Sequence, residues 1–111
     1  MEFDEFTISL LVSGPTPMSD ALQDAHLAHL AQLHDAGTLL AAGPLGDPTR
    51  ELRGLSILNV PVDEARRLKE DDEAVRAGVF SVRVMPWSIP AGAMSFSRTF
   101  FPRSLRDVDG G

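Results

Sequence analysis

The stretch Gly37-Thr38-Leu39-Leu40-Ala41-Ala42-Gly43-Pro44 lies where a helical pattern gives way to a strand pattern. Gly37 stands at the point where a helix would end, because glycine readily adopts the left-handed conformation found at helix C-termini. Residues 38–42 form a short apolar run, which predicts a strand closed by Gly43-Pro44. The stretch therefore predicts a helix followed directly by a strand, and the neighbouring segments extend this order in both directions.

Before this stretch, residues 17–36 have the spacing of an amphipathic helix. One arc of that helix carries leucines and two histidines: Leu22, His26, His29, Leu30 and Leu33. Further upstream, residues 6–12 alternate and then become continuously apolar, which predicts a strand. Thr16 or Ser19 can cap the helix, since a side-chain oxygen satisfies one of its free N–H groups.

After this stretch, residues 54–60 predict a third strand and residues 62–70 a second helix. Residues 71–77 can add a further turn, and residues 79–85 alternate as a fourth strand. The order is β-α-β-β-α-β, which is typical of a ferredoxin-like α+β sandwich. Both helical connections can cover the same face of the sheet, which leaves the other face bare and apolar. The simplest cover is a second copy of the chain, so the sequence predicts a homodimer with its sheets face to face.

The chain has 111 residues, which fits one domain over residues 1–90 followed by a tail over residues 91–111. The tail contains Phe96, Phe100 and Phe101, although disordered tails are normally poor in aromatic residues. We therefore expect the tail to dock on its own subunit or across the dimer, with residues 107–111 fraying.

Composition excludes several kinds of site and partner. The chain has no cysteine, which excludes disulfides, thiol nucleophiles and zinc–thiolate sites. Its net charge is -6 and Lys69 is its one lysine, so nucleic acid and anionic membranes are unfavourable partners. The apolar stretches are too short to span a bilayer, and the acidic start is unlike a signal peptide. We expect a soluble, cytoplasmic protein, and no nucleotide-binding motif indicates a cofactor.

His26 is the first candidate for chemistry, because it lies in the middle of the apolar arc. An inward imidazole is costly to bury without a partner, and it can exchange protons near neutral pH. His26 is therefore either a core residue satisfied by a backbone carbonyl or a general acid/base. His29 or Asp35 is the alternative working group, whereas His34 lies at the edge of the arc and is expected to be solvated.

Three further features have a structural and a functional interpretation. The acidic cluster Asp71-Asp72-Glu73 is either solvated or supplies one carboxylate that orients a histidine. Gly43-Pro44 is either a plain turn or the rim of a pocket, since glycine allows close backbone approach. His26 and His29 are three residues apart, but a third metal ligand and the usual helical motif are missing, so we expect no metal.

Three segments resemble the YCII-related (YciI-like) proteins. They are His26 to Leu30 together with the stretch quoted above, Asp72 to Val79, and Val84 to Trp87. The resemblance spans residues 6–88 and implies a ferredoxin-like fold that assembles as a dimeric α+β barrel. It also implies an active site with a His–Asp pair, which maps onto His26 and Asp72. The chain departs from the family pattern at Glu73 and Ala74, where proline and an aromatic residue are usual.

The resemblance also suggests a type of reaction. One characterised group of the family removes chloride from a chlorinated hydroxyquinol, and muconolactone isomerases share the architecture. We expect lyase, dehydrochlorinase or isomerase chemistry on a hydroxylated cyclic or aromatic substrate, which would contact His29, Gly43 and Pro44. The alternatives are a non-catalytic module that binds a small ligand or a protein in the same cleft, and a purely structural dimer.

Overall fold

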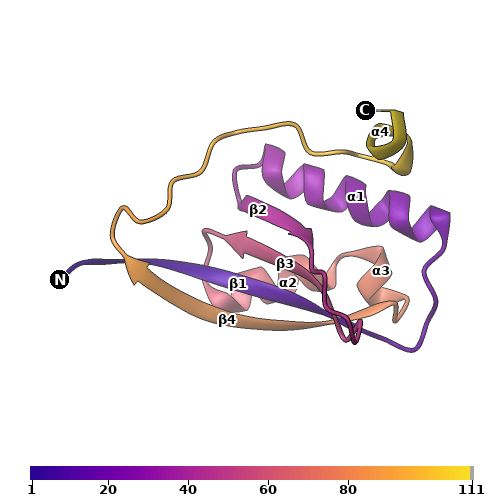
Figure 1. Cartoon of the computed structure of the whole chain (residues 1–111), viewed down its shortest axis with the longest axis horizontal. Coiled ribbons are helices and arrows are strands. Elements are labelled where there is room, and N and C mark those ends of the chain that lie inside the picture. The colour runs from indigo at the N-terminus through magenta and orange to yellow at the C-terminus, as the bar shows by residue number, and fades with distance from the viewer. Residues whose placement is uncertain (111) are drawn as a thin grey trace.

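In the computed structural model, which describes residues 1–110, four antiparallel strands form one sheet in the order β2-β3-β1-β4 (Figure 1). The strands are β1 (Phe3–Ser13), β2 (Leu39–Pro44), β3 (Leu52–Leu58) and β4 (Phe80–Pro90). The helices are α1 (Asp20–Asp35), α2 (Val62–Glu70), α3 (Glu73–Arg76) and α4 (Leu105–Gly110). The predicted ferredoxin-like α+β fold is confirmed, with α3 and α4 as additions to the six-element order.

β1 forms long antiparallel pairings with both of its neighbours in the sheet, β3 and β4. β1 pairs with β4 from Phe3, opposite Pro90, to Ser13, opposite Phe80. β4 is therefore longer than the predicted strand over residues 79–85. Its prolines are tolerated because β4 is an edge strand, where a missing N–H breaks no ladder on the open side.

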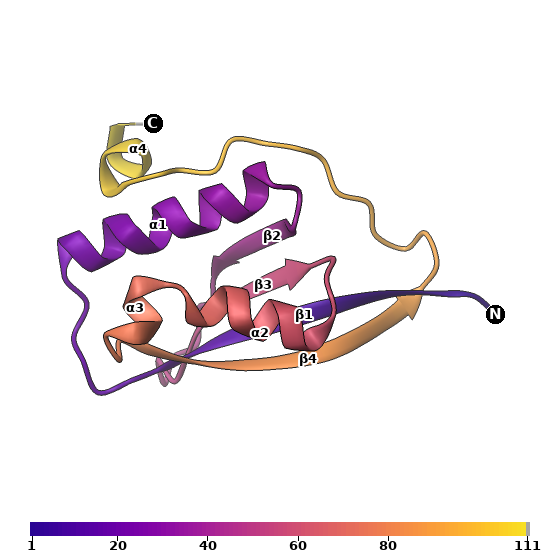
Figure 2. The same cartoon turned by 180° about the vertical axis from the view of Figure 1, so that it is seen from behind.

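Helices α1, α2 and α3 lie on one face of this sheet, with α1 over β2 and α2 against β1 and β4 (Figure 2). The hydroxyl of Ser19 accepts a hydrogen bond from the Leu22 N–H at 3.2 Å, and α1 begins at Asp20. The predicted start at residue 17 is three residues early because Ser19, not Thr16, is the cap. Gly37 has a φ of 81° and follows the helix end as predicted.

The helix-covered face of the sheet holds an apolar core in two clusters. One cluster is Leu11, Ala74, Val79 and Phe80, and the other is Leu33, Leu39, Leu58 and Ala65. The same face also carries a buried polar row, Thr7, Ser9 and Ser56, because side chains of like parity on paired strands point the same way. Ser9 and Ser56 are register partners, and the next pairs on the same face hold Leu58 on one side and Leu11 on the other.

The opposite face of the sheet is apolar. Strand alternation places Ile8 beside Met85 and Leu10 beside Leu55 on this face, and no helix within residues 1–110 covers it. Met85 and Trp87 are 37% and 38% exposed. We call the face formed by Ile8, Leu10, Leu55 and Met85 the open face; the homodimer that would cover it stays a prediction.

The tail over residues 91–110 contacts both β1 and α1. The Phe96 ring meets Phe6 edge-on with a centroid distance of 5.4 Å. Further along, the Phe101 ring stacks on His34 at 4.0 Å, and the Leu105 N–H donates to the Asp24 carboxylate at 2.7 Å. The last described residues belong to α4 and Gly111 lies outside the described residues, so the expected fraying of residues 107–111 stays a prediction. The division into a domain and a tail at residue 90 stays a prediction.

His34 is the clearest correction to the sequence analysis. It was expected to be solvated, but it is buried, with Nδ1 donating to the Leu39 carbonyl at 2.8 Å. Its Nε2 accepts from the Thr99 N–H, and Phe101 covers the ring. The expectation failed because the tail covers a position that the helix alone would expose.

Candidate functional site

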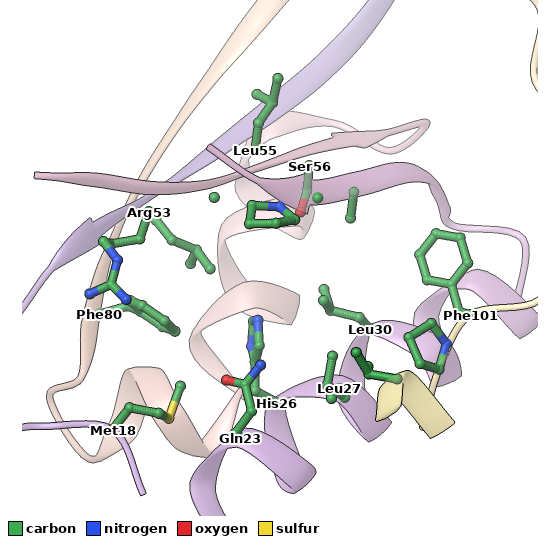
Figure 3. Close-up of a pocket in the computed structure, with 17 residues that line it drawn as sticks. Met18, Gln23, His26, Leu27, Leu30, Arg53, Leu55, Ser56, Phe80 and Phe101 are labelled. Atoms are coloured by element: carbon green, nitrogen blue, oxygen red, sulfur yellow. The ribbon is translucent and has the colours of Figure 1, made fainter. Parts of the chain in front are cut away.

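A cavity of about 380 Å³ opens between α1, the β2–β3 side of the sheet and the tail (Figure 3). Most of its wall is apolar: Leu11, Met18, Leu27, Leu30, Ala42, Phe80, Phe101, Pro102 and Val108. The tail supplies the last three of these residues, so it forms one wall of the cavity. A small, mostly apolar cavity with a few polar groups is the usual form of a small-molecule site.

Four polar side chains line the same cavity. Gln23 and His26 come from α1, and Arg53 and Ser56 come from β3. Figure 3 shows His26 and Ser56 on opposite walls, each directed toward the space between them. The guanidinium of Arg53 also lies over the Phe80 ring, 5.8 Å from its centroid. The polar groups therefore come from both the helix layer and the sheet.

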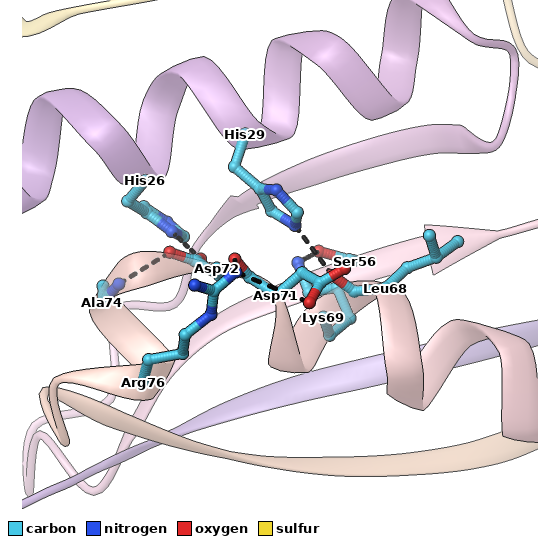
Figure 4. Close-up of polar contacts among 9 residues, drawn as sticks. All are labelled: His26, His29, Ser56, Leu68, Lys69, Asp71, Asp72, Ala74 and Arg76. Atoms are coloured by element: carbon cyan, nitrogen blue, oxygen red, sulfur yellow. Dashed lines mark hydrogen bonds and ion pairs between the residues drawn. The ribbon is translucent and has the colours of Figure 1, made fainter.

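His26 is bonded to Asp72 behind the cavity wall (Figure 4). The distance from His26 Nδ1 to Asp72 Oδ2 is 2.5 Å, and Asp72 is fully buried. An ionised carboxylate can only accept, so Nδ1 carries the hydrogen and the neutral ring keeps its lone pair on Nε2. Within residues 1–110 this Nε2 has no hydrogen-bond partner. A neutral ring in this orientation would present its unprotonated nitrogen to a ligand.

Asp72 is held in place by the start of α3. Its other oxygen, Oδ1, accepts from the Ala74 N–H at 2.9 Å, which caps the helix. Burial disfavours the charged form of Asp72, but the hydrogen bond and charge of His26, together with the Ala74 amide, outweigh it and lower the pKa. Asp72 is therefore ionised near neutral pH, as an orienting partner of a histidine must be.

A second polar pair lies on the sheet side of the cavity. The Lys69 ammonium, on α2, donates to the Ser56 hydroxyl at 3.1 Å, and Lys69 is fully buried. Burial lowers the pKa of Lys69 to about 8, although the charge of Asp72 opposes this effect. Lys69 is still mainly protonated at pH 7.

The structure brings together some of the predicted site residues and separates others. His26, Gly43 and Pro44 line the cavity, and Asp72 stands directly behind His26. His29 does not line the cavity, and its Nε2 donates instead to the Leu68 carbonyl at 2.9 Å. Burial lowers the pKa of His29, and the nearby Lys69 charge adds to this, although Asp72 and the carbonyl oppose it.

The remaining alternative, Asp35, lies away from the cavity. Its carboxylate is exposed and pairs with Arg103 of the tail. Within residues 1–110, no group of three or more histidine or carboxylate side chains is placed to hold a metal ion. In the same part of the chain, no helix is long and apolar enough to cross a membrane.

The sequence analysis missed Ser56, Lys69 and Arg53. Lys69 follows the buried Ala65 by four residues, so helical periodicity places it on the same inward face. Ser56 is a polar residue within the apolar run from Leu55 to Leu58, and its parity matches the buried Gly54 and Leu58. Those two signals were available in the sequence, whereas the place of Arg53 at the cavity depends on tertiary packing, including its contact with the Phe80 ring.

The model of a family described as "YCII-related domain" matches residues 8–88. No curated protein matches the sequence. A solved structure of 5-chloro-2-hydroxyhydroquinone dehydrochlorinase (TftG) from Burkholderia phenoliruptrix, in complex with 2,5-dihydroxybenzoquinone, is similar with a TM-score of 0.54. The match covers 74% of this chain and 92% of that chain, at 23% sequence identity. At this identity the likeness shows the fold alone.

Proposed function

The chain belongs to the YCII-related domain family, and from that premise we propose that it is an enzyme that moves a proton on a small hydroxylated ring. The observation that carries the proposal is the bond between His26 and Asp72 at the cavity wall. In a neutral ring this bond would leave His26 Nε2 unprotonated and available to a substrate in the cavity, which is the arrangement a general base requires. Asp72 would stabilise the imidazolium that forms when Nε2 takes the proton.

The cavity favours a flat, largely apolar substrate of about one ring. Phe80 and Phe101 stand on its wall, and aromatic rings pack well against such side chains. A substrate with ring hydroxyls would bring acidic protons to His26. The similar dehydrochlorinase acts on a hydroxyhydroquinone and was solved with a dihydroxybenzoquinone, which supports this choice of substrate class.

Two reaction types fit one proton-transfer group. In a dehydrochlorination, His26 would take a proton from the substrate while chloride leaves with the electrons of the C–Cl bond, so that HCl is lost overall. In an isomerisation, His26 would take a proton from one atom of the ring and return it to another. Neither reaction consumes an oxidant or a reductant.

The alternative is a module of the same fold that binds a small ligand without reaction. The predominance of apolar side chains in the cavity wall supports this alternative, since binding alone needs no base. The proposal also retains a homodimer formed through the open face and a cytoplasmic location. The apolar character of that face supports the dimer, and a chain without cysteine suits a reducing compartment.

The test is a turnover screen with chlorinated hydroxyquinols, hydroxyquinones and unsaturated lactones. His26→Ala should lower turnover by about 10²–10⁴-fold, the usual contribution of a positioned base, and should still bind substrate. His29→Ala is the matched control, because His29 lies one turn away and does not line the cavity. Equal turnover in the wild type and His26→Ala would reject the proposal, and binding without any turnover would favour the module.

A further inference from the structure

Lys69 is a buried cation that the proposed proton transfer leaves unused. It is the chain's one lysine and is fully buried on the inner side of α2. None of the ion pairs within residues 1–110 includes it, and its hydrogen bond goes to a neutral group, the Ser56 hydroxyl. A buried ammonium without a paired carboxylate is costly, so it is kept where its charge has a task.

Ser56 connects this charge to the cavity. Its oxygen accepts from Lys69, which leaves the hydroxyl hydrogen free to donate, and Ser56 lines the cavity opposite His26 (Figure 3). The Ser9 hydroxyl, on the neighbouring strand, does not accept the hydrogen of Ser56. Ser9 is the register partner of Ser56 on β1, and its buried oxygen has no hydrogen-bond partner within residues 1–110. The Ser56 donor therefore points to a ligand.

The charges on the β3 side of the cavity are positive, whereas the buried carboxylate of Asp72 stands behind His26 on the α1 side. The protein has a net charge of -6, yet no aspartate or glutamate among the described residues lines the cavity. The charged side chains at or behind the β3 wall are cations, Arg53 in the wall and Lys69 behind Ser56. A cationic wall in an acidic protein favours a negatively charged oxygen on the ligand.

We propose that Ser56 and Lys69 form the subsite for an oxyanion of the substrate, namely an ionised hydroxyl or enolate oxygen on the ring. Ser56 would touch this oxygen, and Lys69 would act as a positioning residue that supplies positive charge through Ser56. The subsite rests on the proposed function, because His26 would create the negative charge that Ser56 and Lys69 stabilise from the opposite wall. Donors held in advance against developing charge are a strong source of catalysis.

This subsite predicts a pH dependence of binding. The titratable groups near Lys69 are Asp72 next to α2 and two histidines of α1, His26 and His29. Burial holds the pKa of His29 low and its hydrogen bonds hold the pKa of Asp72 low, so neither changes charge above neutrality. Affinity for an anionic ring should be high below pH 8 and should fall as pH rises through the pKa of Lys69, about 8.

The experiment measures the affinity of the full chain for 2,5-dihydroxybenzoquinone by isothermal titration calorimetry at several pH values. Lys69→Met keeps the length of the side chain and removes its charge, and it should weaken binding about tenfold or more at pH 7 and much less at pH 9.5. Ser56→Ala should weaken binding similarly at pH 7. Arg67→Met, an exposed cation on the same helix, is the control and should bind like the wild type.

A second readout does not depend on the variants. In wild-type protein the Cε carbon of Lys69 is the one lysine Cε signal in the NMR spectrum, and the probe should shift it and raise the pH at which it titrates. The subsite is rejected if Lys69→Met and Ser56→Ala bind the probe like Arg67→Met, or if the wild type does not bind it. An unmoved Lys69 signal under saturating probe would reject it as well, even if Lys69→Met failed to fold.

The two proposals fail separately. If His26→Ala loses turnover while Lys69→Met binds and titrates normally, the oxyanion subsite is wrong and the proton transfer stands. If the probe binds through Ser56 and Lys69 but no substrate turns over, the enzyme proposal is wrong and the anion site remains.

Discussion

The two faces of the sheet have opposite character. The helix-covered face buries hydroxyls and charged groups, with Ser9 and Ser56 on the strands and Lys69 above them, whereas the open face presents Ile8 and Met85. The covered face also holds both apolar clusters of the core, so it combines packing with buried polar groups. Polar groups lie beneath the helices because α1, α2 and α3 supply partners for most of them. The covered face therefore carries the proposed site, and the open face is where the predicted homodimer would form.

The largest expected effect comes from removing the charge of Asp72 on the covered face. Asp72→Asn keeps the size of the side chain and a good helix cap for α3, but it no longer stabilises an imidazolium. We predict a loss of turnover of about 10²–10⁴-fold with nearly unchanged substrate affinity, measured by steady-state kinetics. Asp71→Asn is the control, since Asp71 is the exposed neighbour. Equal losses in both variants would mean that the effect is not specific to the bond with His26.

The next effect concerns the open face. Ile8→Asp places a charge between Ile57 and Met85, its apolar cross-strand neighbours. If two copies pack through this face, dimerisation should weaken by about a hundredfold or more, because the added carboxylate would have to be desolvated in the interface. The mass measured by light scattering should be twice that of the chain for the wild type and that of a single chain for Ile8→Asp. Turnover per chain should fall less than in Asp72→Asn. A wild type that is monomeric at micromolar concentration would remove the open face from assembly.

The buried Lys69 on the covered face should make the free energy of unfolding depend on pH in the alkaline range. The chain has no tyrosine or cysteine, so Lys69 is its one side chain that titrates between pH 8.5 and 11. Its pKa is about 8 in the folded state and 10.5 in the unfolded state. The unfolded chain therefore binds more protons in this range, and stability should rise with pH by a few kcal/mol. Urea unfolding should show this rise in the wild type and not in Lys69→Met; a flat curve in the wild type would mean that Lys69 is solvated.

The smallest expected effect comes from the tail, which contacts the covered side through α1. Ending the chain at Gly92 removes Phe101 from His34 and opens one wall of the cavity. We expect the free energy of unfolding to fall by roughly 2 kcal/mol, given the apolar area and ring stacking that are lost. Arg106→Ala, an exposed change within α4, is the control. An unchanged melting temperature, with rapid amide exchange along the tail, would show that the tail does not hold this position.

The fold was largely predictable because its signals are local. The arc of α1, the stop at Gly37 and the alternation of β1 each lie within a few residues, and each predicted its element. Contacts between segments far apart in the sequence were harder to predict. His34 was misassigned because residues 99–101 cover it, and α4 was missed because the Asp24 carboxylate that meets its first residue is 81 positions away.

The candidate site divides in the same way. The position of His26 on an inward arc was predicted from periodicity, and its pairing with Asp72 was suggested only by the family resemblance. Periodicity places Lys69 and Ser56 on inward faces, but no pattern in either segment specifies that the Lys69 ammonium meets the Ser56 hydroxyl. Polar groups buried on a covered face are thus the part of such a site that a sequence shows least well.

The central claim is that Asp72 fixes His26 with its Nε2 free toward the cavity. Long-range ¹H–¹⁵N NMR correlations of the His26 ring test it most directly, recorded at a pH where the ring is neutral. We predict one tautomer, with the hydrogen on Nδ1 and an unprotonated Nε2 that becomes perturbed when 2,5-dihydroxybenzoquinone is added. A ring with its hydrogen on Nε2, or a mixture of both tautomers, would contradict the claim, because His26 would then lack the oriented lone pair that the proposed proton transfer requires.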